Sequence, residues 1–283
     1  MTANSVHIAF IGFGEVGKKF AGQFITAGAR VSAYDILFDR ADVAAAKRAE
    51  AEAMGVRAGA NAAEAVKGAH VVFSAVTADA VAGVAKGART YMSAGQFFVD
   101  VNSASPETKK AAAAEVNAAG AHYIEAAVMA AVASTGIATP ILSGGPQAQA
   151  AAALLNPLGM QMTPVATEYG RASATKLSRS IIIKGIEALL IDCARAAGAW
   201  GVQDDVFASL KDTFPGTDFT QLSTMTAARV RQHGIRRAAE MREAADMLDD
   251  LDIDPALTRA VADAHERAAA VNADKAKKVR APR

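Results

Sequence analysis

The chain has 283 residues, 30 basic and 29 acidic side chains, a formal net charge of +1 and a single cysteine. The balanced charge excludes a global attraction to nucleic acid or to an anionic membrane surface, so we expect neither as a partner. One cysteine excludes an internal disulfide framework, and the N-terminus lacks the pattern of a secretory signal, so we expect a cytoplasmic protein. The length favours two medium-sized domains.

The first predicted strand leads into a glycine-rich loop. An apolar run, Val6 to Ile11, comes before Gly12, Phe13, Gly14, Glu15, Val16 and Gly17, and a helix is predicted over Val16 to Ala27. In such a unit the first glycine permits a sharp turn, the second admits a pyrophosphate, and the third lets the helix pack against the sheet. The free N–H groups of the helix face the phosphates. These six residues are therefore predicted to bind a dinucleotide.

The second predicted strand indicates which dinucleotide is bound. It runs from Ala29 to Tyr34 and is followed by Asp35, about 20 residues past the glycines, where a carboxylate accepts both ribose hydroxyls. Because the same carboxylate repels the 2′-phosphate of NADP, we expect NAD. Arg40 follows closely, and a guanidinium in this region keeps NADP as the alternative.

Five more β-rich runs alternate with alanine-rich helical segments up to about residue 165. One helix has clear end signals, with Ser105 as N-cap, Pro106 in the first helical position and Gly120 beyond the end. The alternation is typical of a parallel sheet with helices on both faces, and ligands bind at the carboxyl edge of such a sheet. The runs are His70–Ala75, Phe97–Val101, His122–Glu125, Ile137–Ser143 and Gln161–Val165.

Beyond residue 165 the strand signals end. A long helix is predicted over residues 171–198, and further helices, with a break at Pro215 and Gly216, extend to about Ala270. The predicted fold class is therefore α/β. A doubly wound Rossmann sheet is expected in residues 1–165 and an all-α domain in residues 166–283, with the long helix joining them.

The long predicted helix carries polar residues on one face. Lys176, Ser180 and Lys184 are spaced four residues apart, which places them along one side of a helix among apolar neighbours. A lysine in partly buried surroundings can lose its proton near neutral pH and act as a general acid or base. The alternative is a solvated helix face with two surface lysines, and periodicity alone does not decide between the two.

Four ordered segments resemble the β-hydroxyacid dehydrogenases, the family of 3-hydroxyisobutyrate dehydrogenase and 6-phosphogluconate dehydrogenase. The resemblance covers almost the whole chain, and Arg231–Met241 is most similar to the loosely defined 6-phosphogluconate-dehydrogenase-like subgroup. The four segments are Phe10–Gly17, Phe98–Pro106, Glu125–Val128 and Gly170–Lys184.

The resemblance implies roles for particular residues. Lys176 matches the catalytic lysine, which takes the proton from the substrate hydroxyl while a hydride passes to the nicotinamide. Asn102 and Ser103 match the loop beside the nicotinamide and the substrate. Ser180 stands where relatives carry a substrate-binding asparagine, and a hydroxyl there can still form a hydrogen bond. Positions that line the cofactor in relatives are matched by Val76 and Thr77.

Other residues depart from the family pattern and bear on the substrate. Relatives that bind small carboxylates carry two glycines after the position of Val128. This chain has Met129 and Ala130 there, which make the expected substrate site more apolar. Ile183 replaces the glutamate of 6-phosphogluconate dehydrogenase, which disfavours oxidative decarboxylation of a sugar acid phosphate.

Basic residues are further candidates for substrate binding. Lys184 lies on the polar face of the long helix. Arg236 and Arg237 replace the family's lysine–aspartate pair, and an arginine can clamp an anion in a bidentate manner. The alternative is that the two arginines pair with Glu240 and Glu243 on a solvent-exposed face.

Together these features predict an NAD-dependent oxidoreductase that acts on a β-hydroxy acid or on a related, larger hydroxy compound of apolar or aromatic character. One alternative is a lyase that oxidises a β-hydroxyl transiently and then releases carbon dioxide or formaldehyde. Another is a dinucleotide-binding protein without catalysis. Imine reduction is disfavoured, because relatives with that activity generally lack the lysine. The resemblance implies a homodimer through the helical domain, and the five histidines show no spacing that predicts a metal site.

Overall fold

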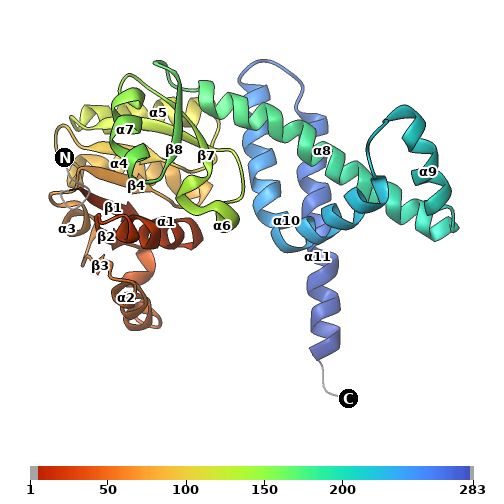
Figure 1. The fold of residues 1–283 in the computed structure, drawn as a ribbon, viewed down its shortest axis with the longest axis horizontal. Helices are drawn as coiled ribbons and strands as arrows, with labels where there is room; N and C mark the ends of the chain where they lie inside the picture. The colour runs from red at the N-terminus through yellow and green to blue at the C-terminus, as the bar shows by residue number, and fades with distance from the viewer. Residues whose placement is uncertain (1–5, 281–283) are drawn as a thin grey trace. The chain divides into compact units, whose positions relative to one another are not determined.

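The computed structural model describes residues 6–280, with side chains as far as residue 270. Contacts between Cα atoms divide the chain into two compact units, which meet between Lys176 and Leu177 inside one helix (Figure 1). Among the described residues, the first unit contains every strand and the second contains helices. The expected α/β unit followed by a helical unit is confirmed.

The first unit is built on an eight-stranded sheet in the order β3-β2-β1-β4-β5-β6-β7-β8. Neighbouring strands are parallel except for β6 and β7, which are antiparallel. Because β1 has β2 on one side and β4 on the other, the loops after β1 and β4 lie at the switch point where such sheets bind ligands. The strands are β1 (His7–Ile11), β2 (Arg30–Tyr34), β3 (Arg57–Ala58), β4 (Val71–Ser74), β5 (Phe97–Asp100), β6 (His122–Val128), β7 (Pro140–Gly144) and β8 (Gln161–Ala166).

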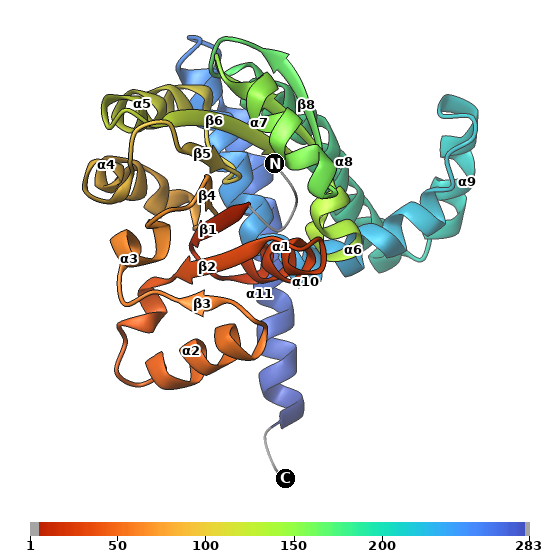
Figure 2. The same cartoon turned by 60° about the vertical axis from the view of Figure 1, so that its left-hand side comes forward.

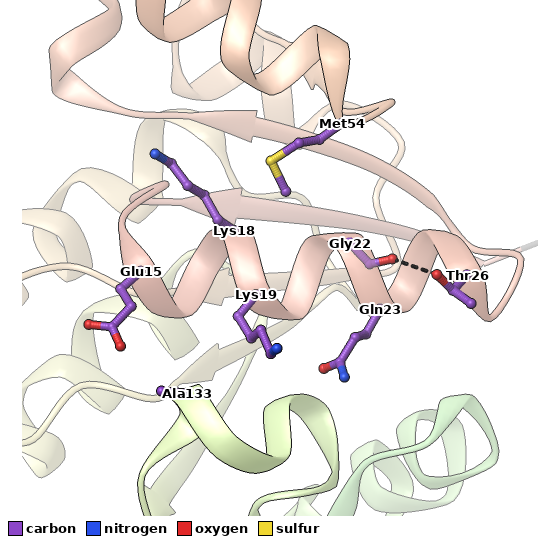
Figure 3. A pocket seen from close by; sticks show the side chains of 8 residues that line it. All are labelled: Glu15, Lys18, Lys19, Gly22, Gln23, Thr26, Met54 and Ala133. Atoms are coloured by element: carbon purple, nitrogen blue, oxygen red, sulfur yellow. Dashed lines mark hydrogen bonds between the residues drawn. The ribbon is translucent and has the colours of Figure 1, made fainter.

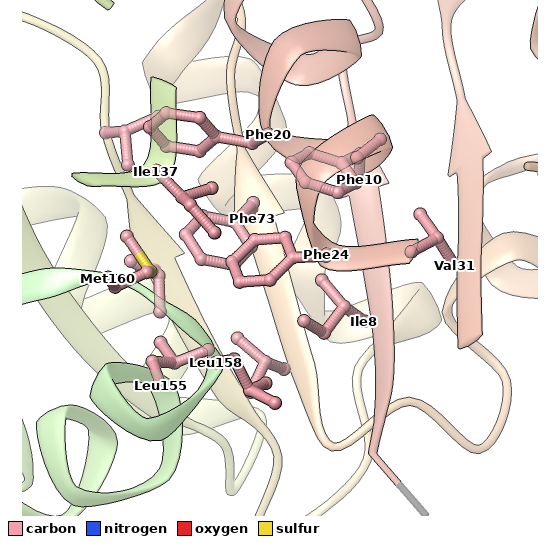
Figure 4. Close-up of a cluster of buried hydrophobic side chains, with 14 of the residues drawn as sticks. Ile8, Phe10, Phe20, Phe24, Val31, Phe73, Ile137, Leu155, Leu158 and Met160 are labelled. Carbon is pink, nitrogen blue, oxygen red and sulfur yellow. The ribbon is translucent and has the colours of Figure 1, made fainter. Parts of the chain in front are cut away.

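Helices cover both faces of this sheet (Figure 2). Successive strand residues point to opposite faces, so a strand buried on both sides needs a continuous apolar run such as Ile8 to Ile11 of β1. On one face Phe10 and Phe73 stack at 5.3 Å between ring centroids, with Phe20 and Phe24 of the first helix packed beside them (Figure 4). The helices of this unit are α1 (Glu15–Thr26), α2 (Ala44–Ala53), α3 (Ala62–Val66), α4 (Val81–Tyr91), α5 (Pro106–Ala118), α6 (Val132–Thr135) and α7 (Ala148–Leu155), with short 3-10 turns η2 (Ile36–Phe38), η3 (Ala78–Ala80), η4 (Gly136–Ala138) and η5 (Asn156–Leu158).

Two strands of the sheet, β7 and β3, differ from the parallel strands that the sequence predicts. The strand expected from Ile137 begins at Pro140, because the turn η4 occupies the preceding residues. It runs antiparallel to β6, since residues 129–139 are too few for the crossover of a dozen or more residues that a parallel pair needs. The two-residue β3 is absent from the prediction because so short an edge strand carries no periodic signal.

The second unit consists of helices. The predicted long helix is α8 (Arg171–Trp200), which ends two residues beyond Gly198, and the expected break at Pro215 and Gly216 separates the next two helices. α10 and α11 approach closely at Gly234, where a Cβ would lie 2.7 Å from the backbone oxygen of His265. None of the described helices combines the length with the apolar character that a membrane-spanning segment requires. The other helices are α9 (Gln203–Thr213), α10 (Phe219–Asp249) and α11 (Ala256–Arg280).

Candidate active site

The glycine loop after β1 has the geometry that a dinucleotide needs. Gly12 has a φ of +89°, and a Cβ there would lie 2.4 Å from the carbonyl oxygen of Ala75, so only glycine fits between the loops after β1 and β4. A Cβ on Gly17 would lie 2.7 Å from the oxygen of Gly12, so α1 begins tightly against the loop. Gly14, in contrast, is exposed and has no atom within 4 Å of its Cβ position. No described side chain caps α1 there, so the loop and the helix terminus fit a pyrophosphate.

Asp35 follows β2 and binds the same loop. Its Oδ2 accepts the N–H of Phe13 at 2.6 Å, and its Oδ1 accepts the N–H of Leu37 at 2.9 Å. A carboxylate oxygen can accept a second hydrogen bond, so both oxygens retain capacity for ribose hydroxyls. Phe13 is buried, whereas Glu15 is exposed and Val16 is half-buried. The structure therefore brings the predicted cofactor residues of the first two strands together.

The segment after β2 is acidic and its arginine is paired. Arg40 is exposed, and its Nη2 and Nε bind the two carboxylate oxygens of Asp42 at 2.5 and 3.1 Å. The Tyr34 hydroxyl donates to Asp39 at 2.5 Å, and this bond to an anion raises the pKa of Tyr34 to about 12. The phenol therefore stays protonated beside the cofactor loop.

A buried hydrogen-bond network joins the loops after β4 and β5. The Asn102 side chain accepts the N–H of Val76 at 2.7 Å and donates to Ser74 Oγ at 2.9 Å and to Asp100 Oδ1 at 2.6 Å. Both amide hydrogens of this buried asparagine are thus used inside the protein. Asn102 fixes the position of Val76, while Thr77 beside it is exposed.

Asp100 is the centre of this network, and the sequence did not mark it as a functional candidate. It is 1% exposed, and its Oδ2 accepts the Tyr123 hydroxyl at 2.6 Å and lies 3.0 Å from Lys109 Nζ. Burial, together with the nearby Asp100 charge, raises the pKa of Tyr123 well above its ordinary value, so its hydroxyl remains a donor. The sequence signal for this pair is weak: an acidic residue at the end of an apolar strand and a lysine at a core-facing position of α5.

Ser103 and the end of β6 complete this edge of the sheet. The Oγ of Ser103 is buried and has no hydrogen-bond partner among the described residues, so it can bind a ligand. β5 and β6 are parallel neighbours, so their carboxyl ends lie at the same edge. Val128 and Met129 at the end of β6 are half-buried, and Ala130 is exposed.

A carboxylate from β6 holds the first turn of α8. Glu125 is fully buried, and its Oε2 accepts the N–H of Gly170 at 2.7 Å while its Oε1 accepts that of Ser173 at 2.6 Å. Lys176 follows one turn later on α8 and is half-buried. The helix turn that carries Lys176 is therefore attached to the strand that ends at Val128.

Two predicted site residues of the second unit share one partner. Ser180 and Lys184 are buried on α8, and both contact Glu240 of α10. Ser180 Oγ donates to Glu240 Oε1 at 2.7 Å, and Lys184 Nζ lies 2.9 Å from the same oxygen. Burial lowers the pKa of the Lys184 ammonium below its ordinary value, although the Glu240 carboxylate opposes this effect. The polar groups of both residues are thus engaged within this unit.

The two neighbouring arginines of α10 have different surroundings. Arg236 is exposed, whereas Arg237 is half-buried and pairs with Glu187 of α8. The buried Glu187 also pairs with Arg229, whose Nη1 lies 2.9 Å from Oε1. Helix packing thus gives Arg237 a buried partner from another helix, which the helical spacing of α10 did not predict.

A hollow on the first unit follows one side of α1 from Glu15 to Thr26 (Figure 3). Of the predicted site residues, only Glu15 of the glycine loop lines it, so the hollow begins beside that loop and does not include Lys176. The hollow is lined by Glu15, Lys18, Lys19, Gly22, Gln23, Thr26, Met54 and Ala133.

Among the residues that the structure describes, no three His, Cys, Asp or Glu side chains are arranged to hold a metal ion.

Family models match most of the chain. Residues 7–166 match the NAD binding domain of 6-phosphogluconate dehydrogenase, and residues 197–268 match a domain of unknown function, DUF1932. The chain is also similar to a curated protein, the mitochondrial 3-hydroxyisobutyrate dehydrogenase of Drosophila melanogaster. The two are 26% identical over 215 residues, which cover 74% of this chain and 64% of that protein.

Solved structures resemble the chain over nearly its full length. A conserved hypothetical protein from Sinorhizobium meliloti is 36% identical with a TM-score of 0.78, over 94% of this chain and 89% of that one. The 3-hydroxyisobutyrate dehydrogenase of Mycobacterium tuberculosis, solved with L-serine, is 19% identical with a TM-score of 0.76 over 94% of each chain. The second likeness shows a common fold.

Proposed function

Because this chain belongs to the β-hydroxyacid dehydrogenase family, we propose that it transfers a hydride between NAD and the carbinol carbon of a β-hydroxy acid or a related hydroxy compound. One observation carries the proposal. The first unit combines an open glycine loop, Asp35 and an unpartnered Ser103 hydroxyl with Lys176 on a helix anchored to the same sheet. This set provides for cofactor binding, substrate binding and proton transfer.

The residues of this chain supply the proton chemistry. Bound NAD supplies the hydride acceptor. Lys176 Nζ takes the proton from the substrate hydroxyl during oxidation and returns it to the carbonyl oxygen during reduction. Ser103 Oγ offers a hydrogen bond to the substrate, and Asn102 acts indirectly by holding the loop at Val76.

Residues of the second unit are proposed to assist with the substrate in different ways. Ser180 keeps acceptor lone pairs while it donates to Glu240, so its hydroxyl still suits a substrate contact. Lys184 and Arg237 are neutralised by carboxylates, which weakens their attraction for an anion. Arg236 is exposed and suits an acid group better than Arg237 does.

The residues at the end of β6 favour a substrate larger than the smallest hydroxy acids. Met129 and Ala130 place a thioether and a methyl group where two glycines would expose backbone N–H groups. An apolar lining favours an alkyl or aromatic substituent over a second polar group. We therefore propose hydroxy acids or alcohols that carry an apolar group.

We propose NAD and not NADP as the cofactor because of the charged residues that follow β2. Asp35 binds the glycine loop directly, and its carboxylate would repel a 2′-phosphate. Arg40 is paired with Asp42, so it attracts that phosphate less than a free guanidinium would.

A substrate panel with purified protein tests the proposal. NAD and NADP are supplied in parallel with hydroxy compounds that range from small β-hydroxy acids to aromatic ones, and the absorbance of the reduced cofactor is followed. We expect NAD reduction with one class and a higher kcat/KM for apolar members. Met129→Gly should shift that preference toward small acids, with Met92→Leu as a control at a remote methionine. Product without net NADH would indicate the lyase, and NAD binding without turnover would indicate a protein that has lost catalysis.

We also propose that residues 1–165 form the cofactor domain and that residues 166–283 form a substrate and dimerisation domain. Ile182, Ile186 and Leu189 of α8 are 65, 47 and 72% exposed, and their spacing puts them on one stripe of the helix. Such an apolar stripe suits a second copy of this chain. Light scattering after size exclusion should give a dimer for the wild type and a monomer for Leu189→Glu.

A further inference from the structure

Glu125 has an environment that a surface carboxylate would not have. It is 0% exposed in the middle of β6, and each of its oxygens accepts one N–H at the start of α8, at 2.7 Å from Gly170, the residue before the helix, and at 2.6 Å from Ser173 in the first turn. Those N–H groups have no partner within the helix, and the positive end of the helix dipole stabilises an anion there. Hydrogen bonds to a charged acceptor are about twice as strong as neutral ones. Glu125 is thus a strong anchor between β6 and α8.

Two glycines of β7 and the turn after it make room for this anchor. A Cβ on Gly144 would lie 2.8 Å from Glu125 Oε2 and 3.1 Å from the backbone oxygen of Glu168. Gly145 has a φ of +114°, and a Cβ there would lie 2.5 Å from the ring of Tyr169, in the turn that enters α8. The backbone of β7 therefore lies directly against the carboxylate and the start of the helix.

The anchor holds the part of α8 that carries the proposed acid and base. Lys176 comes three residues after Ser173, about 4.5 Å further along the helix axis and close to the same face. β6 itself continues from Glu125 to Val128, and Met129 follows it; we propose both as substrate contacts. One carboxylate thus connects the strand that meets the substrate with the turn that carries Lys176.

We propose that Glu125 is a positioning residue for Lys176, through its two hydrogen bonds to the first turn of α8. The role rests on the proposed function, since it concerns the geometry of proton transfer. A displacement of about 1 Å at a reacting group can reduce turnover by a factor on the order of 100. Glu125 contacts neither the glycine loop nor Asp35 in this structure, so its loss should leave cofactor binding unchanged.

Glu125→Gln is the principal test. Glutamine has nearly the same shape, but it offers one acceptor oxygen and turns an NH2 group toward the second backbone N–H. We expect kcat to fall by about 10-fold to 100-fold with an unchanged dissociation constant for NAD. Gly144→Ala is the second variant. The new methyl group displaces the Glu125 carboxylate but leaves the carboxylate itself chemically unchanged. It should lower kcat in the same direction by a smaller factor.

Asn61→Ala is the matched control. The Asn61 side chain accepts the N–H of Glu64 at 2.9 Å and caps α3 in the same unit, so its removal also frees one helix terminus. It should leave kcat unchanged. Glu125→Gln should also change kcat little in a Lys176→Met background, because the effects of substituting two residues that act as one unit are not additive. A purely structural loss would lower the residual rate of Lys176→Met as well.

Hydrogen exchange supplies a readout that does not depend on activity. Amides in the first two turns of α8 should exchange faster in Glu125→Gln, while those of α3 should not change. Unchanged exchange, an unchanged kcat or full additivity with Lys176→Met would overturn the positioning role. If the wild-type protein turns over no hydroxy compound, the proposed function and the catalytic role fall together, and faster exchange would then leave Glu125 as an anchor of α8 alone.

Discussion

Replacing Lys109 by methionine removes one half of the buried ion pair beneath the loops after β4 and β5. Asp100 and Lys109 are each 1% exposed, and their charged atoms lie 3.0 Å apart. Methionine keeps the apolar stem but leaves the Asp100 carboxylate without its counter-charge, and breaking a buried pair in this way costs about 3 to 5 kcal/mol. Asp100 keeps hydrogen bonds from Asn102 and Tyr123, so we expect a value near the lower end, about 3 kcal/mol.

Calorimetric melting of the full chain measures this loss. For a domain of roughly 150 to 250 residues, 1 kcal/mol shifts Tm by about 2 to 4 °C, so Lys109→Met should lower the Tm of the first unit by about 6 to 12 °C. Lys110→Met is the control, because its ammonium pairs with Glu107 on the surface and exposed pairs contribute about 0.2 to 1 kcal/mol. Asp100→Asn combined with Lys109→Met should recover most of the stability, since it removes both charges. A shift for Lys109→Met no larger than that for Lys110→Met would refute the reasoning.

Other perturbations have distinct expected results. Gly14→Ala should weaken NAD binding by about tenfold or more without loss of stability, because its Cβ position is open; calorimetric titration measures this. Gly12→Ala should instead lower Tm, since its Cβ would meet the oxygen of Ala75. Asp35→Ala should weaken NAD binding by about 10-fold to 100-fold, from the loss of about 1.5 to 3 kcal/mol in hydrogen bonds to a charge, and should weaken NADP binding less. Burial lowers the pKa of His265 below its ordinary 6.5, so the folded state favours the neutral ring. Its contribution to stability is complete above pH 6.5 and decreases as pH falls toward the lowered pKa, and melts of His265→Gln should show a flatter dependence in that window.

Local patterns were enough to predict the geometry of the glycine loop and the place of Asp35 beside it. The glycine loop, Asp35 and the cap at Ser105 depend on residues close together in sequence, and a single strand–loop–helix unit fixes their geometry. The Ser105 side chain accepts the N–H of Thr108 as the cap signal predicts. The alternation of strands and helices likewise indicated the doubly wound sheet, although not the reversal of β7.

Long-range pairing of buried charges was not predictable from the same patterns. Glu125 lies 45 residues before Gly170, and a carboxylate inside an apolar strand gives no sign of its partner. The Lys184 contact with Glu240 joins two helices, whereas helical spacing reports only which residues share a face. The sequence marked Asn102 as a candidate site residue. Its hydrogen bonds with Val76 and Asp100 were not predictable, because they depend on how two loops pack together.

The turnover number of Lys176→Met with saturating NAD and the best hydroxy substrate tests the central claim most directly. General acid and base catalysis contributes about 100-fold to 10,000-fold, so we predict a fall in kcat of that size with NAD affinity unchanged. A folded Lys176→Met variant that binds NAD and keeps kcat within about tenfold of the wild type would contradict the account.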